Sequence, residues 1–297
     1  AYPVQGLINP LAVIAAMERY SDPKVSVVMI GTTSMYARAD ERLEAVQKLL
    51  EIVQDCIAEP ARGLSARLAK LRKFCARWGG ERNADRLFEA FYRMDEALRL
   101  KQASAPRYSN FYCGVSMRHL TRPLLIKPDV LKPAEEAYFL PYVVGIYESE
   151  TRGDYIDLHG SRIAGPGPRD DGGLRSALSA ALGAARVMES VPDAPEKPWL
   201  TELALGLRMW ASEVRSIHNF YLAQLIRDRN KDVLAAKPRI PDKAPTWTGD
   251  PDYLEWFAIQ RDEFDNANEL IRLLETGGLP LFFRAANQRY EDTFVIG

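Results

Sequence analysis

The feature that most constrains the fold is a long amphipathic stretch from Trp199 to Asn230. Its apolar residues recur in steps of three and four, which places one continuous stripe on one side of an α-helix. The stripe consists of Leu200, Leu203, Leu207, Trp210, Val214, Ile217, Tyr221 and Leu225. A helix of this length far exceeds the average of about 11 residues, so one short neighbour could not cover it. We therefore expect several other helices to pack along it.

Shorter amphipathic patterns predict an all-α fold, a multi-helix bundle around one long central helix. In the N-terminal helical segment, residues 1–103, Asn9-Pro10 is a typical helix start, with asparagine as N-cap and proline at the first helical position. Three further helices before residue 103 have short connections, so we expect them to lie antiparallel. The residues expected on the inward faces of these four helices are Leu11, Ile14 and Met17; Leu43, Val46, Leu50, Val53 and Ile57; Leu64, Leu68, Leu71 and Cys75; and Ala84, Leu87, Phe91, Met94 and Leu98.

The middle of the chain differs from both ends. Residues 104–173 form an irregular aromatic and Gly/Pro-rich segment, and its part from Glu148 to Gly173 has the composition of a long loop. The C-terminal helical segment, residues 174–297, holds an Ala-rich helix suited to close packing, the long helix, and a helix that starts at Asp250-Pro251. Its expected inward set is Leu254, Phe257, Arg261 or Phe264, Ile271 and Leu274. Because the chain lacks an initial Met and a polar tail, we expect one compact helical domain excerpted from a longer chain.

The composition excludes several classes of partner. The 297 residues carry a formal net charge of −1, so no electrostatic argument favours nucleic acid or an anionic membrane. The sequence has neither a run of about 18 apolar residues nor a signal peptide, which predicts a soluble protein, cytoplasmic or periplasmic. The three cysteines match no zinc spacing and predict no disulfide framework. Cys56 and Cys75 occupy apolar helix positions that are typical of buried thiols.

The best constellation for chemistry lies in the Gly-rich loop. Asp154 and Asp157 are the candidate catalytic residues, because two carboxylates with separated pKa values can act as general acid and base. Tyr155, His159 and Arg162 are candidates for substrate binding. Two other interpretations stay open: a loop in which both carboxylates bond nearby backbone amides, and a divalent-cation site completed by His159. Cofactor motifs are absent from the sequence, so we expect no cofactor.

A second cluster combines Arg118, His119 and Arg122 with three aromatic residues between positions 108 and 112. Aromatic faces beside charged donors suit a sugar ring, because its C–H face stacks on aromatic side chains while its hydroxyls accept hydrogen bonds. The cluster therefore favours saccharide or glycan binding. The alternative is a partly buried loop whose arginines pair with acidic residues of neighbouring helices.

Polar residues also interrupt the apolar surface of the long helix, at Arg215, His218 and Asn219. Buried polar groups need hydrogen-bonding partners. His218 is either a hydrogen-bonded core residue or a substrate-binding residue. Pairing of His218 or Asn219 with the Gly-rich loop would fix that loop in place.

Several stretches resemble parts of large bacterial glycoside-hydrolase-like proteins, in which an α-helical region follows a (β/α)₈ barrel. The similar stretches are residues 8–13, residues 78–81 with the following helix from Ala84 to Leu98, residues 118–124 and residues 215–221. The resemblance implies a carbohydrate-related setting and a helical domain beside a barrel. The sequence departs from a complete enzyme of that kind because the βαβ alternation of a barrel is missing. The family's catalytic carboxylates match no residue of this chain.

Two main hypotheses follow. The first is a helical domain of a carbohydrate-active enzyme, which packs against the adjacent catalytic domain of its parent chain and contributes loop residues to the rim of a saccharide-binding cleft. The second is an α-helical protein-interaction or scaffold module without catalytic activity, which predicts a contiguous exposed apolar patch. A third, an all-α lyase or transferase that holds Mg²⁺ through acids such as Asp170 and Asp171, ranks last because these acids lie in a loop.

Overall fold

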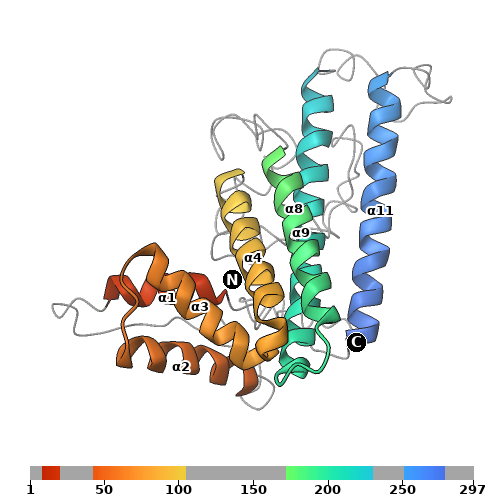
Figure 1. Ribbon diagram of the computed structural model, residues 1–297. Helices are drawn as coiled ribbons and strands as arrows, with labels where there is room; N and C mark the ends of the chain where they lie inside the picture. Colours follow the sequence, from red (N-terminus) through yellow and green to blue (C-terminus); the bar gives the residue numbers. More distant parts are fainter. Residues whose placement is uncertain (1–8, 21–42, 105–171, 230–250, 278–297) are drawn as a thin grey trace, which may run out of the picture. The chain divides into compact units, whose positions relative to one another are not determined.

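The structure is a computed structural model that describes residues 9–20, 43–104, 172–229 and 251–277. Within these ranges the fold is all-α, as predicted, with seven α-helices, one short 3₁₀ helix and no strand. The elements are α1 (Pro10–Tyr20), α2 (Leu43–Ala58), α3 (Gly63–Gly79), η2 (Glu81–Asn83), α4 (Ala84–Ser104), α8 (Gly172–Ser190), α9 (Lys197–Arg229) and α11 (Pro251–Gly277) (Figure 1). None of these helices combines the length and the apolar character that crossing a membrane requires.

The described residues belong to two compact units. The N-terminal unit holds residues 9–20, 43–100 and 176–211, and the C-terminal unit holds residues 101–104, 172–175, 212–229 and 251–277. Helix α9 is 33 residues long and supplies residues to both units. The stripe residues from Leu200 to Val214 are all buried, so the prediction of one long helix with an apolar side is confirmed for this part.

Aromatic side chains form the centre of the N-terminal unit. The ring centroid of Trp199 on α9 lies 4.9 Å from that of Trp78 on α3 and 6.1 Å from that of Phe91 on α4. The rings of Trp78 and Phe91 are 5.7 Å apart, and all three residues are buried. Aromatic pairs at these separations add to the stability that their buried area provides. Helices α3, α4 and α9 therefore meet at one aromatic core.

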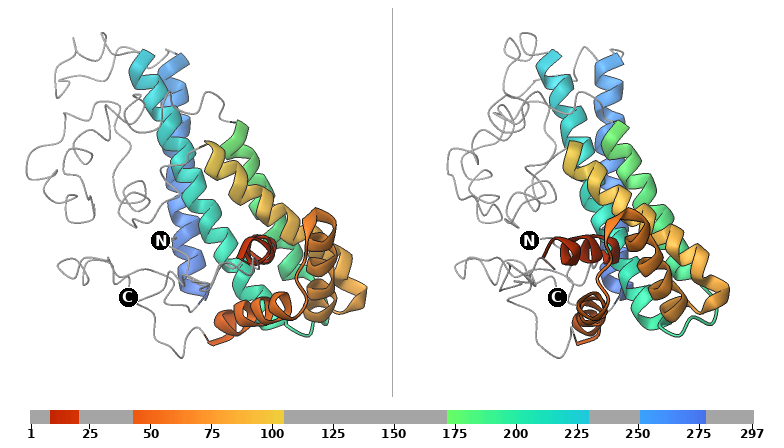
Figure 2. Two further views of the ribbon diagram at one scale, coloured as in Figure 1. Left: turned by 90° about the vertical axis from the view of Figure 1, so that its left-hand side faces the viewer. Right: turned by 60° about the vertical axis from the view of Figure 1, so that its left-hand side comes forward.

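Helix α8 packs through small side chains, as its Ala-rich sequence predicts. Its fully buried residues include Ala177, Ala181 and Ala184, and both views show it beside α4 (Figures 1 and 2). A Cβ atom added at Gly183 would lie 3.1 Å from a guanidinium nitrogen of Arg93 on α4. The short side chains thus allow the close approach of these two helices.

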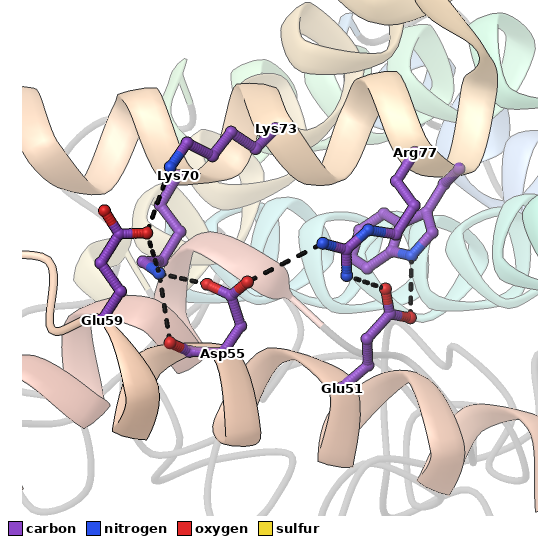
Figure 3. A network of polar contacts seen from close by, with 7 residues as sticks. Glu51, Asp55, Glu59, Lys70, Lys73 and Arg77 are labelled. Carbon is purple, nitrogen blue, oxygen red and sulfur yellow. Dashed lines mark hydrogen bonds and ion pairs between the residues drawn. The ribbon is translucent and has the colours of Figure 1, made fainter.

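Helices α2 and α3 lie antiparallel, as predicted, and ion pairs join them (Figure 3). Arg77 near the end of α3 contacts Glu51 in the middle of α2, and Lys70, two turns earlier in α3, pairs with Asp55, one turn later in α2. Lys70 is only 4% exposed, and its ammonium group also donates to the backbone carbonyl of Asp55 at 3.3 Å. The network therefore places charged side chains along one edge of the contact between the two helices.

The predicted inward faces are confirmed for α1 and largely for α4, where Leu11, Ile14, Met17, Leu87, Phe91 and Met94 are all buried. They are partly wrong for α2 and α3. Leu50 and Ile57 of α2 are 47% and 67% exposed, and Leu64 of α3 is 60% exposed. The physical reason in α2 is its acidic edge: turning Glu51 and Asp55 toward the cations of α3 buries Ile52 and Cys56 and leaves Leu50 and Ile57 outside.

Candidate functional site

Helix α11 meets the second half of α9 through a cluster of polar side chains within the C-terminal unit. Helix α9 contributes Ser212, Arg215, Ser216 and Asn219, whose spacing places them on one face, and α11 contributes Asp262, Glu263 and Asn266. We call these residues the α9–α11 polar cluster. Because residue 212 bonds to residue 266 while residue 219 bonds to residue 262, the two helices run antiparallel, and they lie side by side in Figures 1 and 2.

The strongest contact of the cluster is a bidentate ion pair. Arg215 donates from Nε to Oδ2 of Asp262 at 2.9 Å and from a second guanidinium nitrogen to Oδ1. Asn219 donates from Nδ2 to the same Oδ2 at 2.8 Å. The hydrogen bond from Arg215 chiefly lowers the pKa of Asp262, and the bond from Asn219 and the charge of His218 act in the same direction. Asp262 is therefore a carboxylate at neutral pH.

Asn266 is the buried amide that α11 contributes to the cluster, and it is 2% exposed. Its Oδ1 accepts a hydrogen bond from Oγ of Ser212 at 2.9 Å. Its Nδ2 donates to the backbone carbonyl of Ser212 at 2.9 Å and to Oγ of Ser216 at 3.0 Å. Buried amides need such partners. A shift of α11 along α9 would remove them, so Asn266 fixes the register of the pair.

The pKa of Glu263 is shifted in the opposite direction from that of its neighbour Asp262. Burial raises the pKa of Glu263, and hydrogen bonds from Ser216, Asn219 and Asn266 oppose part of this rise. Ser216 donates to Oε1, and Asn219 donates to Oε2 at 2.9 Å. Carboxyl groups with diverging pKa values occur in acid–base sites and also in structural networks. Because these contacts join one helix to the other, we interpret the cluster as a structural joint that holds α11 on α9.

Replacing Glu263 with glutamine is expected to flatten the dependence of the free energy of unfolding on pH. Since the folded-state pKa of Glu263 is raised, the contribution of this carboxyl group is fully present below its ordinary value of 4.5 and is lost as the pH rises through the folded-state pKa. Glutamine does not titrate in this range, and its NH2 group replaces one of the two oxygens that accept from Ser216 and Asn219, which costs about 1–3 kcal/mol at every pH. Urea unfolding across this pH range, with Glu269→Gln on the exposed side of α11 as control, measures the slope. A glutamine variant whose stability falls with pH as steeply as that of the wild type would refute this assignment.

Most of the predicted site residues fall elsewhere in the chain. Asp154, Asp157, Arg118, His119, Arg122, Tyr155, His159 and Arg162 lie outside the described residues, as do Asp170 and Asp171. His218 is described: it is half-buried on α9, and its charge acts on Asp262. For Asn219 the sequence suggested a partner in the Gly-rich loop, whereas the structure gives it partners on α11. The structure thus places His218 beside the polar cluster.

The sequence analysis missed the α11 half of the cluster. The face of α11 that meets α9 carries the buried residues Trp256, Ile259 and Asn266, with Glu263 between them. Their positions recur in steps of three and four, which is a helical stripe. This spacing alone predicts a buried helix face. The stripe mixes apolar and polar residues, so hydrophobicity does not identify it.

Another side of α11 carries large apolar residues that are exposed. Leu254, Phe257, Phe264 and Ile271, which we call the outer stripe, are 56%, 55%, 69% and 50% exposed. The prediction that this set faces inward is wrong, since Trp256 and Ile259 are buried at 4% and 5% exposure instead. The alternative inward residue, Arg261, is exposed as well. Turning Asn266 and Glu263 toward the polar groups of α9 satisfies buried hydrogen-bonding groups, and this rotation leaves the outer stripe facing away.

The described residues offer neither a metal centre nor an activated thiol. Within the described ranges, no group of three or more His, Cys, Asp or Glu residues is placed to hold a metal ion. Cys56 and Cys75 are buried free thiols, as predicted. Burial raises the pKa of both, that of Cys75 to about 12. Both thiols therefore stay protonated at neutral pH, and a protonated thiol is a poor nucleophile.

Comparison with known proteins finds no matching protein-family model, no matching curated protein and no matching solved structure. The function is therefore inferred from the described helices themselves. Two of their features bear on it: a buried polar cluster that fixes α11 on α9, and an exposed apolar stripe on another side of the same helix.

Proposed function

We propose that this chain is an α-helical protein-interaction module in which the outer stripe of α11 binds an amphipathic helix of a partner protein. The observation that supports the proposal is the exposure of four large apolar side chains, each 50% or more, along one helix. Contiguous exposed apolar patches are typical of interaction surfaces. Phe257, Phe264 and Ile271 also follow one another at intervals of seven residues, which is the spacing at which helices pair in coiled coils.

The polar cluster favours this function because it orders the helix that carries the stripe. Arg215 and Asp262 hold α11 through two parallel hydrogen bonds, and Asn266 fixes its register on α9. A partner helix would therefore meet a surface that is already formed. Binding to such a surface avoids much of the entropy cost of ordering a flexible segment, and an amphipathic helix laid on an apolar helix face is a common recognition mode.

Peptide binding by the full chain tests the proposal. The probe is a fluorescent synthetic helix with leucines at heptad spacing and equal numbers of Lys and Glu elsewhere. Fluorescence anisotropy should rise with the wild-type chain and stay flat with the Phe257→Ser/Phe264→Ser variant. The matched control, Leu50→Ser/Ile57→Ser, changes two exposed apolar residues of α2 and should bind like the wild type. Absence of binding to the wild-type chain, or equal loss in both variants, would reject the proposal.

Stability measurements on the same variant provide a second test. Because Phe257 and Phe264 are exposed, each serine is expected to change the free energy of unfolding by about 0.5 kcal/mol or less. Circular dichroism and urea unfolding measure this. A large loss of stability would mean that the two rings belong to the core of the protein, and the outer stripe would then not be a docking surface.

The carbohydrate hypothesis stays a prediction from the sequence. It holds that the chain is a helical domain of a carbohydrate-active enzyme, and of its site residues only His218 is among the described ones. Glycan binding by the full chain, followed by Asp157→Ala and His159→Ala, tests it. Loss of binding in both variants would support a saccharide-binding loop, and unchanged binding would remove that loop from the mechanism.

A further inference from the structure

Charges of both signs lie beside the outer stripe of α11. By helical spacing, the exposed residues Arg261, Asp265, Arg272 and Glu275 lie on the stripe or along one flank of it. Two of them are positive and two are negative, so this flank has no net charge. An interface between two identical copies uses the same surface twice, and that surface has to be complementary to itself. A flank that carries both signs meets this requirement.

Antiparallel pairing of two α11 helices brings opposite charges of this flank together. In one register, Leu254 of one copy lies opposite Ile271 of the other. Arg261 then lies opposite Phe264 of the other copy and one residue, about 1.5 Å along the helix axis, from Asp265. A guanidinium group is attracted both by an aromatic face and by a carboxylate. Because the pair has two-fold symmetry, these contacts occur twice.

Other arrangements of the two helices bring like charges together. In the next antiparallel register, one heptad further along, the two Asp265 residues would lie within two residues of each other along the axis. Parallel pairing would place Arg261 beside Arg261 and Asp265 beside Asp265. Like charges at facing positions oppose helix pairing. Charge therefore favours one antiparallel register.

The two remaining charges of the flank fit the same register. Glu275 of one copy would lie beside the first turn of α11 of the other copy. A carboxylate is favourable there, because a helix N-terminus carries a partial positive charge. Arg272 lies 3.9 Å from Glu269, so its charge is offset within its own helix. The register therefore leaves the whole flank in a favourable electrostatic setting.

We infer that the outer stripe binds the same stripe of a second copy of this chain, with the two α11 helices antiparallel. The inference rests on the proposed function and names its partner protein. Pairing would cover the exposed apolar side chains of both copies, and removal of apolar surface from water drives such association. One helix pair covers less than the roughly 1,200 Å² that is typical of stable interfaces. The chain is therefore expected to be a monomer in dilute solution and a dimer at high concentration.

Sedimentation equilibrium of the full chain at increasing concentration tests the inference. The wild-type chain is expected to pass from monomer to dimer, and Phe257→Ser/Phe264→Ser should stay a monomer. The matched control, Leu50→Ser/Ile57→Ser, changes two exposed apolar residues of α2 and should form the dimer like the wild type. A wild-type chain that is monomeric at every concentration at which it stays soluble, or a dimer that Phe257→Ser/Phe264→Ser retains, would overturn the inference.

Charge exchange between Arg261 and Asp265 tests the antiparallel register. Arg261→Asp and Asp265→Arg each bring like charges together, so each should raise the Kd of the dimer about tenfold in low salt. The double variant Arg261→Asp/Asp265→Arg should restore the dimer, and a mixture of the two single variants should form a heterodimer. The controls Arg82→Asp and Glu96→Arg change exposed residues of η2 and α4 and should leave the Kd unchanged. A double variant as weak as the single ones would overturn this register.

The outcomes separate this inference from the proposed function. The leucine-heptad peptide binds the same stripe, so it is expected to dissociate the dimer into monomers that carry peptide. A chain that stays monomeric at high concentration and binds the peptide at the outer stripe would overturn the second copy as partner and leave docking intact. A chain that neither dimerises nor binds the peptide would reject docking itself.

Discussion

Replacing Trp199 with alanine is expected to lower the free energy of unfolding by about 3–5 kcal/mol. Trp199 is 1% exposed and packs against Trp78 and Phe91, with ring centroids 4.9 Å and 6.1 Å away. Alanine would remove these contacts and leave a cavity where α3, α4 and α9 meet. Urea unfolding followed by circular dichroism measures the loss.

The matched control for Trp199 is an aromatic residue that lies outside this core. Tyr92 of α4 is 43% exposed, and its ring centroid is 6.5 Å from that of Phe88. Tyr92→Ala is expected to cost about 1 kcal/mol or less, because surface substitutions have small effects. Trp199→Phe should recover part of the loss by filling some of the cavity. Equal losses for Trp199→Ala and Tyr92→Ala would show that the aromatic core does not organise the N-terminal unit.

Replacing Asn266 with leucine is expected to cost about 1–3 kcal/mol, although leucine is similar in size and more apolar. The asparagine amide satisfies the hydroxyl and the carbonyl of Ser212 and the hydroxyl of Ser216 in a buried setting. Leucine cannot form hydrogen bonds, so these groups would lose a partner without regaining water. Urea unfolding monitored by circular dichroism reports the change.

A combined variant separates the loss of hydrogen bonds from a loss of packing. Ser212→Ala added to Asn266→Leu removes the hydroxyl that donates to the asparagine, and it keeps Ser216 for Glu263. Replacing both partners of a buried hydrogen bond by apolar groups is less costly than removing one, so the double variant is expected to recover part of the stability that Asn266→Leu loses. A double variant no more stable than the single one would mean that the bond between Ser212 and Asn266 contributes nothing to the effect.

The long helix was predictable because its apolar stripe is unbroken over the first half. From Leu200 to Val214 each step of three or four residues reaches another large apolar side chain, and these residues are buried as expected. The single apolar stripe therefore identifies the single buried face of this half of α9. The helix ends were also predictable where the chemistry is local: the amide of Ala12 donates to Oδ1 of Asn9 at 3.4 Å, as expected for an N-cap.

The orientation of α11 was not predictable from hydrophobicity, because this helix has apolar residues on two sides. One side has Leu254, Phe257, Phe264 and Ile271, which hydrophobicity favours as the inward face, and the other has Trp256 and Ile259 among polar residues. The choice between them depends on hydrogen bonds to another helix. Those bonds link residues about 45 positions apart in the sequence, such as Arg215 and Asp262, whose separation is 47.

The candidate site was predictable only on its α9 half. The sequence predicts hydrogen-bonding partners for Arg215 and Asn219, because buried polar residues within an apolar helix face need them. Their partners, Asp262 and Glu263, look in the sequence like ordinary charged residues on an exposed helix face. Asp262 and Glu263 can be recognised as partners only if it is known that α11 packs on α9. The residue pattern of one helix does not show which other helix it contacts.

Hydroxyl-radical footprinting of the full native chain, analysed by mass spectrometry, tests most directly which side of α11 faces α9. Trp256 is 4% exposed, whereas Phe257 and Phe264 are 55% and 69% exposed. The two phenylalanines should therefore be modified faster than Trp256, even though tryptophan is the more reactive side chain in the unfolded chain. Rapid modification of Trp256 with protection of Phe257 and Phe264 would show that the helix is turned the other way and that the outer stripe belongs to the core.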